Sequence, residues 1–486
     1  MRRTKIVCTI GPATDSIEMM EALVRAGMDV ARLNFSHGSL DEHRARIQRL
    51  REVEEKLGKP IGILIDIQGP KIRIGELPGD RCLIAAGEEV YVWPRPVAQC
   101  EPEGEKHLPI LYPRLLEQLQ PGQTIYLDDG LLELTVEEVL GDRARCRVVT
   151  GGELRSRKGV SLPDVDVDLP AIDEADIEHI RFGVEAGVDF IAASFVRRPE
   201  HVEAVKAVIR EAGGHQQVIA KIESREGVRN LDGILEVADG IMVARGDMGV
   251  ELPSEEVPLV QKRLIAKCNL VGKPVITATQ MLDSMARNPR PTRAEVTDVA
   301  NAIFDGTDAV MLSGETAVGR YPVEAVRMMH RIARTSEEAL DYAALLDRQR
   351  HQTKRSVADA IARATCETAA DLEVTAILCS TQSGATARMV SKYRPRSRII
   401  AMTPNPEVVR QLSIVWGVTP FLVPKARRID EMMAYSIRRA KESGLVKDGD
   451  RIAIAAAVLT GTPGSTNLLQ IHVVGDERYG ALHGNA

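Results

Sequence analysis

Residues 217–251 read QVIAKIESREGVRNLDGILEVADGIMVARGDMGVE, and this stretch indicates the fold of the chain. Two short apolar runs, Val218–Ile222 and Gly240–Ala244, have the length and composition of buried strands. The residues between them, Ser224–Val237, have the pattern of a helix. The stretch is therefore predicted to be a strand–helix–strand unit of an α/β protein.

Charged residues end both predicted strands. Lys221 and Glu223 close the first strand, and Asp247 follows the second. Because neighbouring parallel strands end at the same edge of a sheet, the carboxylates of Glu223 and Asp247 are expected to converge and to suit Mg²⁺ or Mn²⁺. Lys221 shares a strand face with Glu223 and would meet a substrate that gains negative charge. An internal salt bridge is the simpler alternative, but charge at two strand ends favours a site.

The composition excludes several classes of protein. With 486 residues, 44% hydrophobic and 27% charged, the chain is typical of a globular protein of roughly two to four domains. The net charge of -6 gives no reason to expect nucleic acid or a membrane surface as a partner. No apolar run is long enough to span a bilayer, and no signal peptide is recognisable. The seven cysteines form no CxxC pair, so we expect reduced thiols and a cytoplasmic location.

The alternation of strands and helices continues along much of the chain. Eight strands are predicted, at Thr4–Ile10, Met28–Leu33, Pro60–Ile65, Val188–Ser194, Val218–Ile222, Gly240–Ala244, Pro274–Thr277 and Asp308–Leu312. This number favours a (β/α)₈ TIM barrel, with a doubly wound sheet as the alternative. Between the third and fourth strands the helical pattern gives way to short alternating runs, which predict an inserted β-rich domain. A second α/β region follows the barrel.

The expected domain boundaries follow from these changes of pattern. The predicted segments are 1–68 and 163–345 for the barrel, 69–162 for the inserted domain, 346–475 for the C-terminal α/β domain and 476–486 for a tail. Barrel enzymes carry their chemistry at the carboxyl ends of the strands. The amino-terminal ends of the predicted strands carry few polar residues. The carboxyl ends are polar and carry Asn34, Asp66, Ser194, Glu223, Asp247, Thr279, Ser313 and Glu315.

Several long motifs resemble one family. They are TKIVCTIGPAT, RLNFSHG, DIQGPKIR, KGVSLP, AKIES, MVARGDMGVE, TATQMLDSM, RAEVTDVANAIFDGTDAVMLSGETAVGRYP and SGATARMVSKYRP, spread from Thr4 to beyond Arg394. Together they resemble pyruvate kinase. The resemblance implies a barrel interrupted by a β-barrel lid, a C-terminal regulatory domain and usually a homotetramer. It also implies a glycolytic phosphotransferase that converts phosphoenolpyruvate and ADP to pyruvate and ATP.

The resemblance assigns residues to the substrates. Lys221 is expected to stabilise the transferring phosphoryl group and the enolate oxygen, and Thr279 to act near the enolate carbon through water with Ser313 and Glu315. Arg32 and Arg73 are expected to hold phosphate and to take part in catalysis. The implied substrate-binding residues are Arg32, Lys221, Ala244, Arg245, Gly246, Asp247 and Thr279. The implied nucleotide-binding residues are Arg32, Asn34, His37, Arg73 and Lys158. Without the KGVSLP motif, Lys158 would be interpreted as a solvated surface lysine, and His37 alone as a structural histidine.

One position departs from the commoner family pattern. Most relatives have a glutamate where this chain has Lys71, and they require K⁺. The corresponding K⁺ shell would be Asn34, Ser36, Asp66 and the carbonyl of Ile67. An ammonium group at 71 would place its charge near that ion, so Lys71 is predicted to replace K⁺ and K⁺ is predicted not to be required. The alternative is that Lys71 points to solvent and K⁺ still binds.

The C-terminal domain contains an expected effector site. The residues assigned to it by resemblance are Ser380, Thr381, Gln382, Ser383, Gly384 and Thr386 in one loop, with Gly464 and Thr466 in a second. Hydroxyls and amides at a helix N-terminus suit a phosphate group, which predicts a phosphorylated allosteric activator of undetermined identity. Viewed alone, the first loop could be an ordinary helix cap.

Two other functions fit parts of the sequence. A Mg²⁺-dependent barrel lyase or mutase acting on phosphoenolpyruvate or pyruvate would use a similar metal site but would not need ADP. A non-catalytic sensor would bind a phosphorylated metabolite through the loop at Ser380–Thr386. The presence of Lys221, Glu223, Asp247 and Thr279 argues against the sensor.

Overall fold

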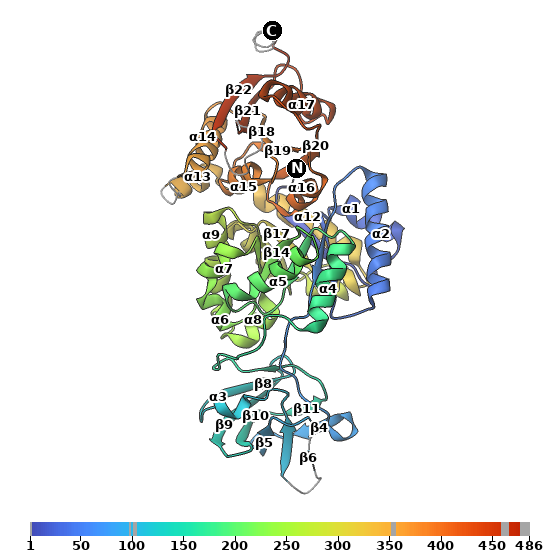
Figure 1. The fold of residues 1–486 in the computed structure, drawn as a ribbon, viewed down its shortest axis with the longest axis vertical. Coiled ribbons are helices and arrows are strands. Elements are labelled where there is room, and N and C mark those ends of the chain that lie inside the picture. Colours follow the sequence, from blue (N-terminus) through green and yellow to red (C-terminus); the bar gives the residue numbers. More distant parts are fainter. Residues whose placement is uncertain (1, 97–98, 101–104, 351–355, 458–465, 477–486) are drawn as a thin grey trace.

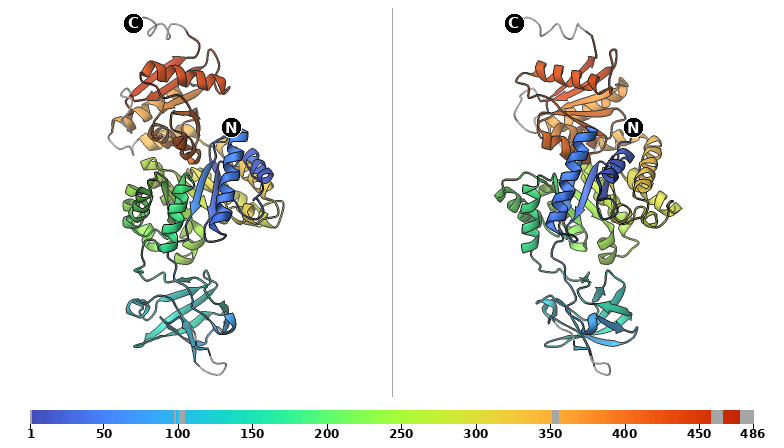
Figure 2. Two further views of the ribbon diagram at one scale, coloured as in Figure 1. Left: turned by 45° about the vertical axis from the view of Figure 1, so that its right-hand side comes forward. Right: turned by 90° about the vertical axis from the view of Figure 1, so that its right-hand side faces the viewer.

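The computed structural model describes residues 2–96, 99–100, 105–350, 356–457 and 466–476. Three bodies follow one another along the long axis of the molecule: the C-terminal α/β domain at one end, a barrel in the middle and a β-domain at the other end (Figure 1). Figure 2 shows the β-domain standing away from the barrel in two further views. None of the helices in the described ranges combines the length and hydrophobicity that crossing a bilayer requires.

Eight parallel strands close the central barrel, so the predicted (β/α)₈ fold is confirmed. In order around the wall they are β1 (Lys5–Thr9), β17 (Ala309–Leu312), β16 (Val275–Ala278), β15 (Gly240–Ala244), β14 (Gln217–Ile222), β13 (Phe190–Ala193), β3 (Gly62–Asp66) and β2 (Val30–Asn34). Nearly all their residues are buried, because the inner face fills the barrel and the outer face packs on helices.

Helices surround this wall. They are α1 (Ile17–Ala26), α2 (Leu40–Leu57), α4 (Glu174–Glu185), α5 (Pro199–Glu211), α6 (Arg225–Arg229), α7 (Leu231–Val237), α8 (Arg245–Glu251), α9 (Val257–Val271), α10 (Arg293–Asp305), α11 (Gly314–Ala317) and α12 (Pro322–Glu338), with the short 3₁₀ turn η2 (Asp283–Ala286) before α10. Local signals set their ends: Ser39 forms a capping box at the start of α2, and Gly58 ends it in the left-handed conformation.

The helix predicted between the two strands of residues 217–251 was wrong in detail. The single helix expected over Ser224–Val237 is two helices, because Asn230 leaves helical geometry and its side chain donates to the carbonyl of Arg197 at 2.9 Å. The residues that follow β15 form the helix α8. Helix α12 ends at Glu338, and a separate helix, α13 (Tyr342–Arg350), follows it.

The amino-terminal ends of the barrel strands are not plain, which corrects a further expectation. Four aspartates lie there, three of them buried and Asp239 half-buried, and each accepts a hydrogen bond from a backbone N–H of the neighbouring strand at 2.8–3.1 Å. The residues are Asp29, Asp189, Asp239 and Asp308. Backbone groups at a strand start lack a ladder partner, so these carboxylates satisfy donors that burial would otherwise leave unpaired. They are structural groups.

The inserted domain is built from β-strands. One sheet runs β12 (Val160–Ser161), β8 (Thr124–Leu127), β9 (Leu132–Val139), β10 (Ala144–Thr150), β5 (Glu89–Trp93), β7 (Lys106–Pro109) and β6 (Gln99–Cys100). Beside it β4 (Arg81–Ile84) pairs with β11 (Gly152–Arg155), and two short helical turns, η1 (Pro78–Asp80) and α3 (Leu115–Gln118), complete it. The domain has its own hydrophobic core.

The C-terminal domain is a five-stranded sheet between helices. Its strands are β20 (Val418–Leu422), β19 (Arg398–Thr403), β18 (Ala376–Ser380), β21 (Arg451–Ala456) and β22 (Leu468–Val473), of which β22 is antiparallel. Its helices are α14 (Val357–Asp371), α15 (Ala385–Lys392), α16 (Pro406–Gln411), the 3₁₀ turn η3 (Leu412–Ile414) and α17 (Ile429–Glu442). Strands β20 and β22 were not predicted from the sequence.

Two arginines of this domain contact the barrel's aspartates. The guanidinium of Arg394 lies 3.0 Å from Asp308, with both side chains buried, and that of Arg410 lies 2.8 Å from Asp189. The same aspartates therefore support the barrel wall and attach the C-terminal domain to it.

Candidate active site

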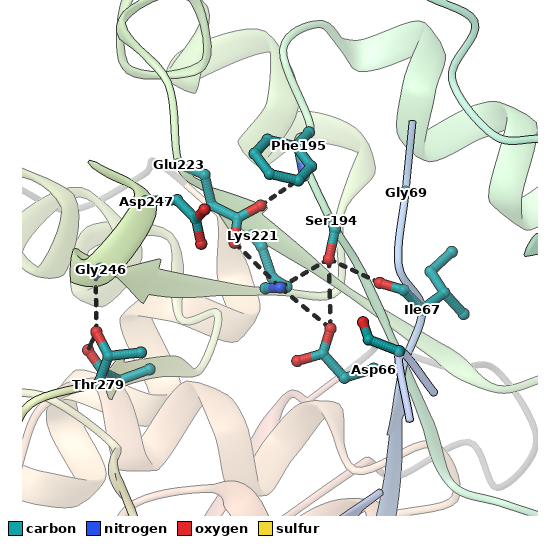
Figure 3. Close-up of polar contacts among 12 residues, drawn as sticks. Asp66, Ile67, Gly69, Ser194, Phe195, Lys221, Glu223, Gly246, Asp247 and Thr279 are labelled. Carbon is teal, nitrogen blue, oxygen red and sulfur yellow. Dashed lines mark hydrogen bonds and ion pairs between the residues drawn. The ribbon is translucent and has the colours of Figure 1, made fainter. Parts of the chain in front are cut away.

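The carboxyl ends of four barrel strands bring a compact group of charged side chains together (Figure 3). Asp66 ends β3, Ser194 follows β13, Lys221 and Glu223 lie at the end of β14, and Asp247 lies in the first turn of α8 after β15. The predicted convergence of Lys221, Glu223 and Asp247 at one edge is therefore present.

Lys221 lies at the centre of this group. Its Nζ is 2.7 Å from Ser194 Oγ, 3.0 Å from Glu223 Oε1 and 3.1 Å from Asp66 Oδ1. Burial by itself lowers the pKa of Lys221, but the carboxylates of Asp66 and Glu223 raise it well above its ordinary value. The ammonium group is therefore charged throughout the neutral pH range.

Glu223 is 1% exposed and is held from two sides. The backbone N–H of Phe195 donates to its Oε2 at 2.7 Å, and Lys221 faces its Oε1. Phe195 adopts a positive φ of 52°, an unusual backbone conformation for a bulky residue. Burial raises the pKa of Glu223, Lys221 opposes that effect, and the nearby charge of Asp247 adds to it. A divalent cation between the two carboxylates would relieve this repulsion.

The donor set fits a magnesium or manganese ion. Glu223 and Asp247 offer carboxylate oxygens, and among the described residues Oε1 of Glu223 has no hydrogen-bond donor beyond its ion pair with Lys221. In the described part of the chain no cluster of three or more His, Cys, Asp or Glu side chains is placed to hold a metal. Two protein carboxylates with the remaining positions left to water and substrate oxygens are the usual arrangement for Mg²⁺ at phosphate-handling sites.

Thr279 closes one side of the site in a strained conformation. Its φ is 68°, its hydroxyl donates to the carbonyl of Ala278 at 2.7 Å, and the same oxygen accepts the N–H of Gly246 at 2.9 Å. Arg245 supports it from behind, because its guanidinium donates to the carbonyl of Thr279 at 2.6 Å and pairs with Asp298 at 2.7 Å. The Arg245 side chain is thus used within the protein. Ala244 is buried as the last residue of β15.

Arg32 approaches from β2 on the other side of Asp66. Its Nε lies 2.7 Å from Asp66 Oδ2, and its Nη1 donates to Thr9 Oγ1 at 2.9 Å. Asp66 is therefore shared by Arg32 and Lys221. Although burial alone raises the pKa of Asp66, these two cations hold it below its ordinary value. The shared carboxylate fixes the spacing of the two positive charges.

Ser313 and Glu315 lie beside the site rather than in contact with Thr279. The carboxylate of Glu315, 3% exposed, accepts the backbone N–H of Leu282 at 3.0 Å and that of Ser313 at 2.7 Å. Burial raises its pKa. Glu315 thereby ties together the loops after β16 and β17, and within the described residues neither it nor Ser313 hydrogen-bonds Thr279.

The residues expected to bind nucleotide are divided between two domains. Asn34 ends β2 of the barrel and the exposed His37 follows it. The Asn34 side chain accepts the N–H of Ser36 at 3.2 Å, and the His37 carbonyl contacts His43 Nε2 at 2.9 Å. The other two expected nucleotide-binding residues, Arg73 and Lys158, contact residues of the inserted domain.

The lid-side residues make local contacts. Arg73 donates to the carbonyl of Arg157 at 3.0 Å, and Lys158 pairs with Asp128 at 2.8 Å. The Lys158 side chain is 43% exposed, so it is free to change partner.

Lys71 lies at the junction of the lid and the barrel mouth. Its Nζ is 3.1 Å from Asp129 of the lid and 3.3 Å from Asp247, and it lies over the ring of Phe195 at 5.7 Å. Burial lowers the pKa of Lys71, but the two aspartates raise it above its ordinary value. The lysine therefore directs its charge at Asp247, a proposed metal ligand. Of the residues that the resemblance assigns to the K⁺ shell, Asn34 ends β2 and Ser36 follows it.

Sequence reasoning missed three side chains that the structure adds. Ser194 was recognised only as a polar strand end, and Thr9 and Asp129 had no distinguishing motif of their own. Each contacts a site residue across a long separation in sequence, namely Lys221, Arg32 and Lys71. Only the barrel closure and the lid placement bring these pairs together.

The expected effector loop joins β18 to α15. Gly384 has a φ of 80°, and the Gln382 carbonyl accepts the side-chain amide of Asn405 at 2.7 Å. The hydroxyls of Thr386 and Thr466 are 2.7 Å apart, so the two predicted loops meet there. Gly464, also assigned to this site, lies outside the described residues.

Comparison with known proteins agrees with this geometry. The family model described as "Pyruvate kinase, barrel domain" matches residues 1–326, and "Pyruvate kinase, alpha/beta domain" matches residues 359–472. Curated pyruvate kinases of Staphylococcus epidermidis and Staphylococcus aureus are 52% identical over 480 residues, and that of Bacillus licheniformis is 52% identical over 479. Each alignment covers 98% of this chain and 81% of the relative. The chain therefore belongs to the pyruvate kinase family.

Proposed function

We propose that this member of the family transfers the phosphoryl group of phosphoenolpyruvate to ADP at the mouth of the barrel. The observation that carries the proposal is the placement of a largely buried, positively charged Lys221 between Asp66 and Glu223, with Asp247 near Glu223. Phosphoryl transfer needs charge neutralisation and alignment more than covalent catalysis. A fixed cation beside a pair of metal-binding carboxylates supplies both.

Each part of the site has a role in this scheme. Glu223 and Asp247 would hold Mg²⁺ or Mn²⁺, which when bound neutralises substrate oxygens. Lys221 donates to the transferring phosphoryl group and to the enolate oxygen as the bond between them breaks. The new bond forms to a β-phosphate oxygen of ADP, and the enolate then takes a proton on its methylene carbon.

The proton step concerns Thr279. Its hydroxyl proton is directed at the Ala278 carbonyl, so it must rotate before it can face substrate or a water. Glu315 is occupied by two backbone N–H groups and is better placed to fix the loops than to pass a proton. We therefore assign Thr279 the contact with a water near the enolate carbon, and Ser313 and Glu315 a supporting part.

Nucleotide binding would involve movement of the lid. Lys158 is paired with Asp128, and exchange of that carboxylate for the phosphates of ADP would accompany closure. Arg32, Asn34 and His37 would provide the barrel side of the nucleotide site, and Arg73 the lid side. Exposed lysine pairs contribute little stability, so the exchange costs little free energy.

Two regulatory features belong to the same proposal. Lys71 is proposed to make K⁺ unnecessary, because its ammonium group already places a fixed positive charge beside Asp247. The loop at Ser380–Thr386 is proposed to bind the phosphate of an activator, since hydroxyls and amides gather before α15. A homotetramer in the cytoplasm is expected from the family resemblance.

The direct test is formation of pyruvate from phosphoenolpyruvate and ADP with Mg²⁺, measured in K⁺-free buffer and again with K⁺. ADP-dependent pyruvate and ATP in equal amounts would support the proposal. Pyruvate formed without ADP, or carbon–carbon products, would favour a lyase or mutase. No turnover in either the K⁺-free or the K⁺ buffer, with and without phosphorylated activators, would contradict the proposal that the protein is a kinase.

A further inference from the structure

The hydroxyl of Ser194 makes the shortest contact of the Lys221 ammonium group. The Nζ–Oγ distance is 2.7 Å, against 3.0 Å to Glu223 and 3.1 Å to Asp66. An ammonium group has three N–H donors, and these three acceptors use all of them. Ser194 is 5% exposed, so no solvent competes freely for its hydroxyl.

The direction of the Ser194 hydroxyl follows from its partners. Because Lys221 can only donate, Ser194 Oγ accepts from it and must place its own proton elsewhere. The carbonyl of Ile67 lies 2.7 Å away and is the nearer acceptor, since Asp66 Oδ1 is at 3.3 Å. The Ile67 carbonyl therefore turns the lone pairs of Ser194 toward Lys221 (Figure 3).

Close packing holds Ser194 in this orientation. Gly69 adopts a φ of +70°, and a Cβ at that position would lie 2.9 Å from the Cβ of Ser194 and 3.0 Å from its carbonyl oxygen. The N–H of Gly69 is itself fixed by Asp176 Oδ1 at 3.1 Å. The segment that leads into the lid thus lies directly on Ser194, and only a glycine allows this approach.

We propose that Ser194 is a positioning residue that aims Lys221 at the phosphoryl group; this rests on the proposed function. A neutral hydroxyl holds the ammonium group in place without cancelling its charge, which a third carboxylate would do. If Glu223 held a metal ion and substrate took one N–H donor of Lys221, Ser194 and Asp66 would still hold Nζ on the barrel side. The Lys221 side chain is then already in the required rotamer when the transition state forms.

The test compares Ser194→Ala with a matched loss of another buried barrel hydroxyl. Thr307 lies at the opposite end of the barrel, accepts from Thr277 Oγ1 at 2.9 Å and is 1% exposed. Thr307→Val is expected to lower the Tm while leaving kcat within about twofold of wild type, because a loss of stability alone does not alter transition-state contacts.

For Ser194→Ala the expected result is a parallel fall in kcat and in kcat/KM for phosphoenolpyruvate of about 10- to 100-fold. The affinity for Mn²⁺ alone, measured by titration calorimetry, is expected to stay unchanged, because Glu223 keeps its bond from Phe195. If Ser194→Ala does not fold, Ser194→Cys keeps the side-chain volume but is a weak acceptor, and the same fall is expected.

Two results would overturn the inference. One is a kcat for the Ser194 variants equal to that of wild type, as for Thr307→Val. The other is weakened Mn²⁺ binding with kcat restored at saturating Mn²⁺, which would place the effect at the metal rather than at Lys221. Wild-type protein without ADP-dependent turnover would instead refute the proposed function, and the positioning role would fall with it.

Discussion

Lys71 Nζ lies 3.3 Å from Asp247 Oδ1, so a fixed positive charge adjoins one of the two carboxylates proposed to bind metal. The same ammonium group contacts Asp129 of the lid. Its position next to Asp247 gives the barrel mouth a permanent cation that does not depend on a bound monovalent ion. It also links lid and barrel through two ion pairs that a change of residue at 71 would break.

The charge at position 71 is expected to determine the need for K⁺. Wild type is expected to have the same kcat with and without K⁺, whereas Lys71→Glu is expected to lose activity without K⁺ and to regain part of it with K⁺. The reason is that a carboxylate at 71 removes one positive charge and attracts a monovalent cation. The measurement is kcat at saturating substrates in tetramethylammonium or K⁺ buffer. A wild type that requires K⁺ would contradict the role given to Lys71.

The glycine at the lid entry is expected to affect catalysis through Ser194. Gly69→Ala forces a Cβ to within 2.9 Å of the Ser194 Cβ, and Gly213 offers a matched control with a φ of +75° and nothing within 4 Å. Gly213→Ala is expected to lose about 1 kcal/mol of stability, because alanine disfavours a positive φ, and Gly69→Ala is expected to lose more because its Cβ also meets Ser194. Only Gly69→Ala is expected to lower kcat, by about tenfold or more. Equal kcat values in the two variants would argue against the coupling.

The buried pair between Arg394 and Asp308 is expected to hold the C-terminal domain on the barrel. Arg394→Met leaves the buried Asp308 carboxylate without its guanidinium partner, and the free energy of unfolding is expected to fall by roughly 3 kcal/mol. Arg334→Met removes an exposed pair with Glu338 and is expected to cost less than about 1 kcal/mol. Denaturant unfolding of both variants checks this. Similar losses would show that the interface does not depend on Arg394.

Lys5 is expected to make stability depend on alkaline pH. Burial lowers the pKa of Lys5 from 10.5 to about 8, and its Nζ donates to the Val418 carbonyl at 2.7 Å. Between pH 8 and 10.5 the unfolded chain binds more protons, so this group adds stability as the pH rises and loses it as the pH falls through 8. The change in the free energy of unfolding caused by Lys5→Met, variant minus wild type, is therefore expected to be about 2 kcal/mol more positive at pH 7 than at pH 10. A pH-independent difference would contradict the buried charge.

The sequence predicts the fold well where local and periodic signals are strong. The eight apolar runs, the capping serine at position 39 and the glycine after α2 are all local features, and the strand count favours the closed barrel over a doubly wound sheet. The breaks at Asn230 and after Glu338 were not predicted, because apolar spacing continues across them. The bond from Asn230 to Arg197 depends on a neighbouring loop and has no local signature.

The site was predictable in its charged residues but not in its supporting contacts. Strand ends and family motifs identified Lys221, Glu223 and Asp247, since charged residues after apolar runs are conspicuous. Ser194 and Thr9 hold the site's cations by a single hydroxyl each, and hydroxyls at strand ends are common. Their roles follow from partners far away in the sequence, which only the closed barrel specifies.

The role of Lys221 is decided by the turnover of Lys221→Met with phosphoenolpyruvate, ADP and Mn²⁺, measured together with Mn²⁺ binding. We expect a loss of at least about 10²- to 10³-fold in kcat with metal binding retained, because a charge that stabilises the transition state is removed. Substantial turnover by Lys221→Met, with folding and Mn²⁺ affinity like those of wild type, would show that Lys221 does not stabilise the transferring phosphoryl group.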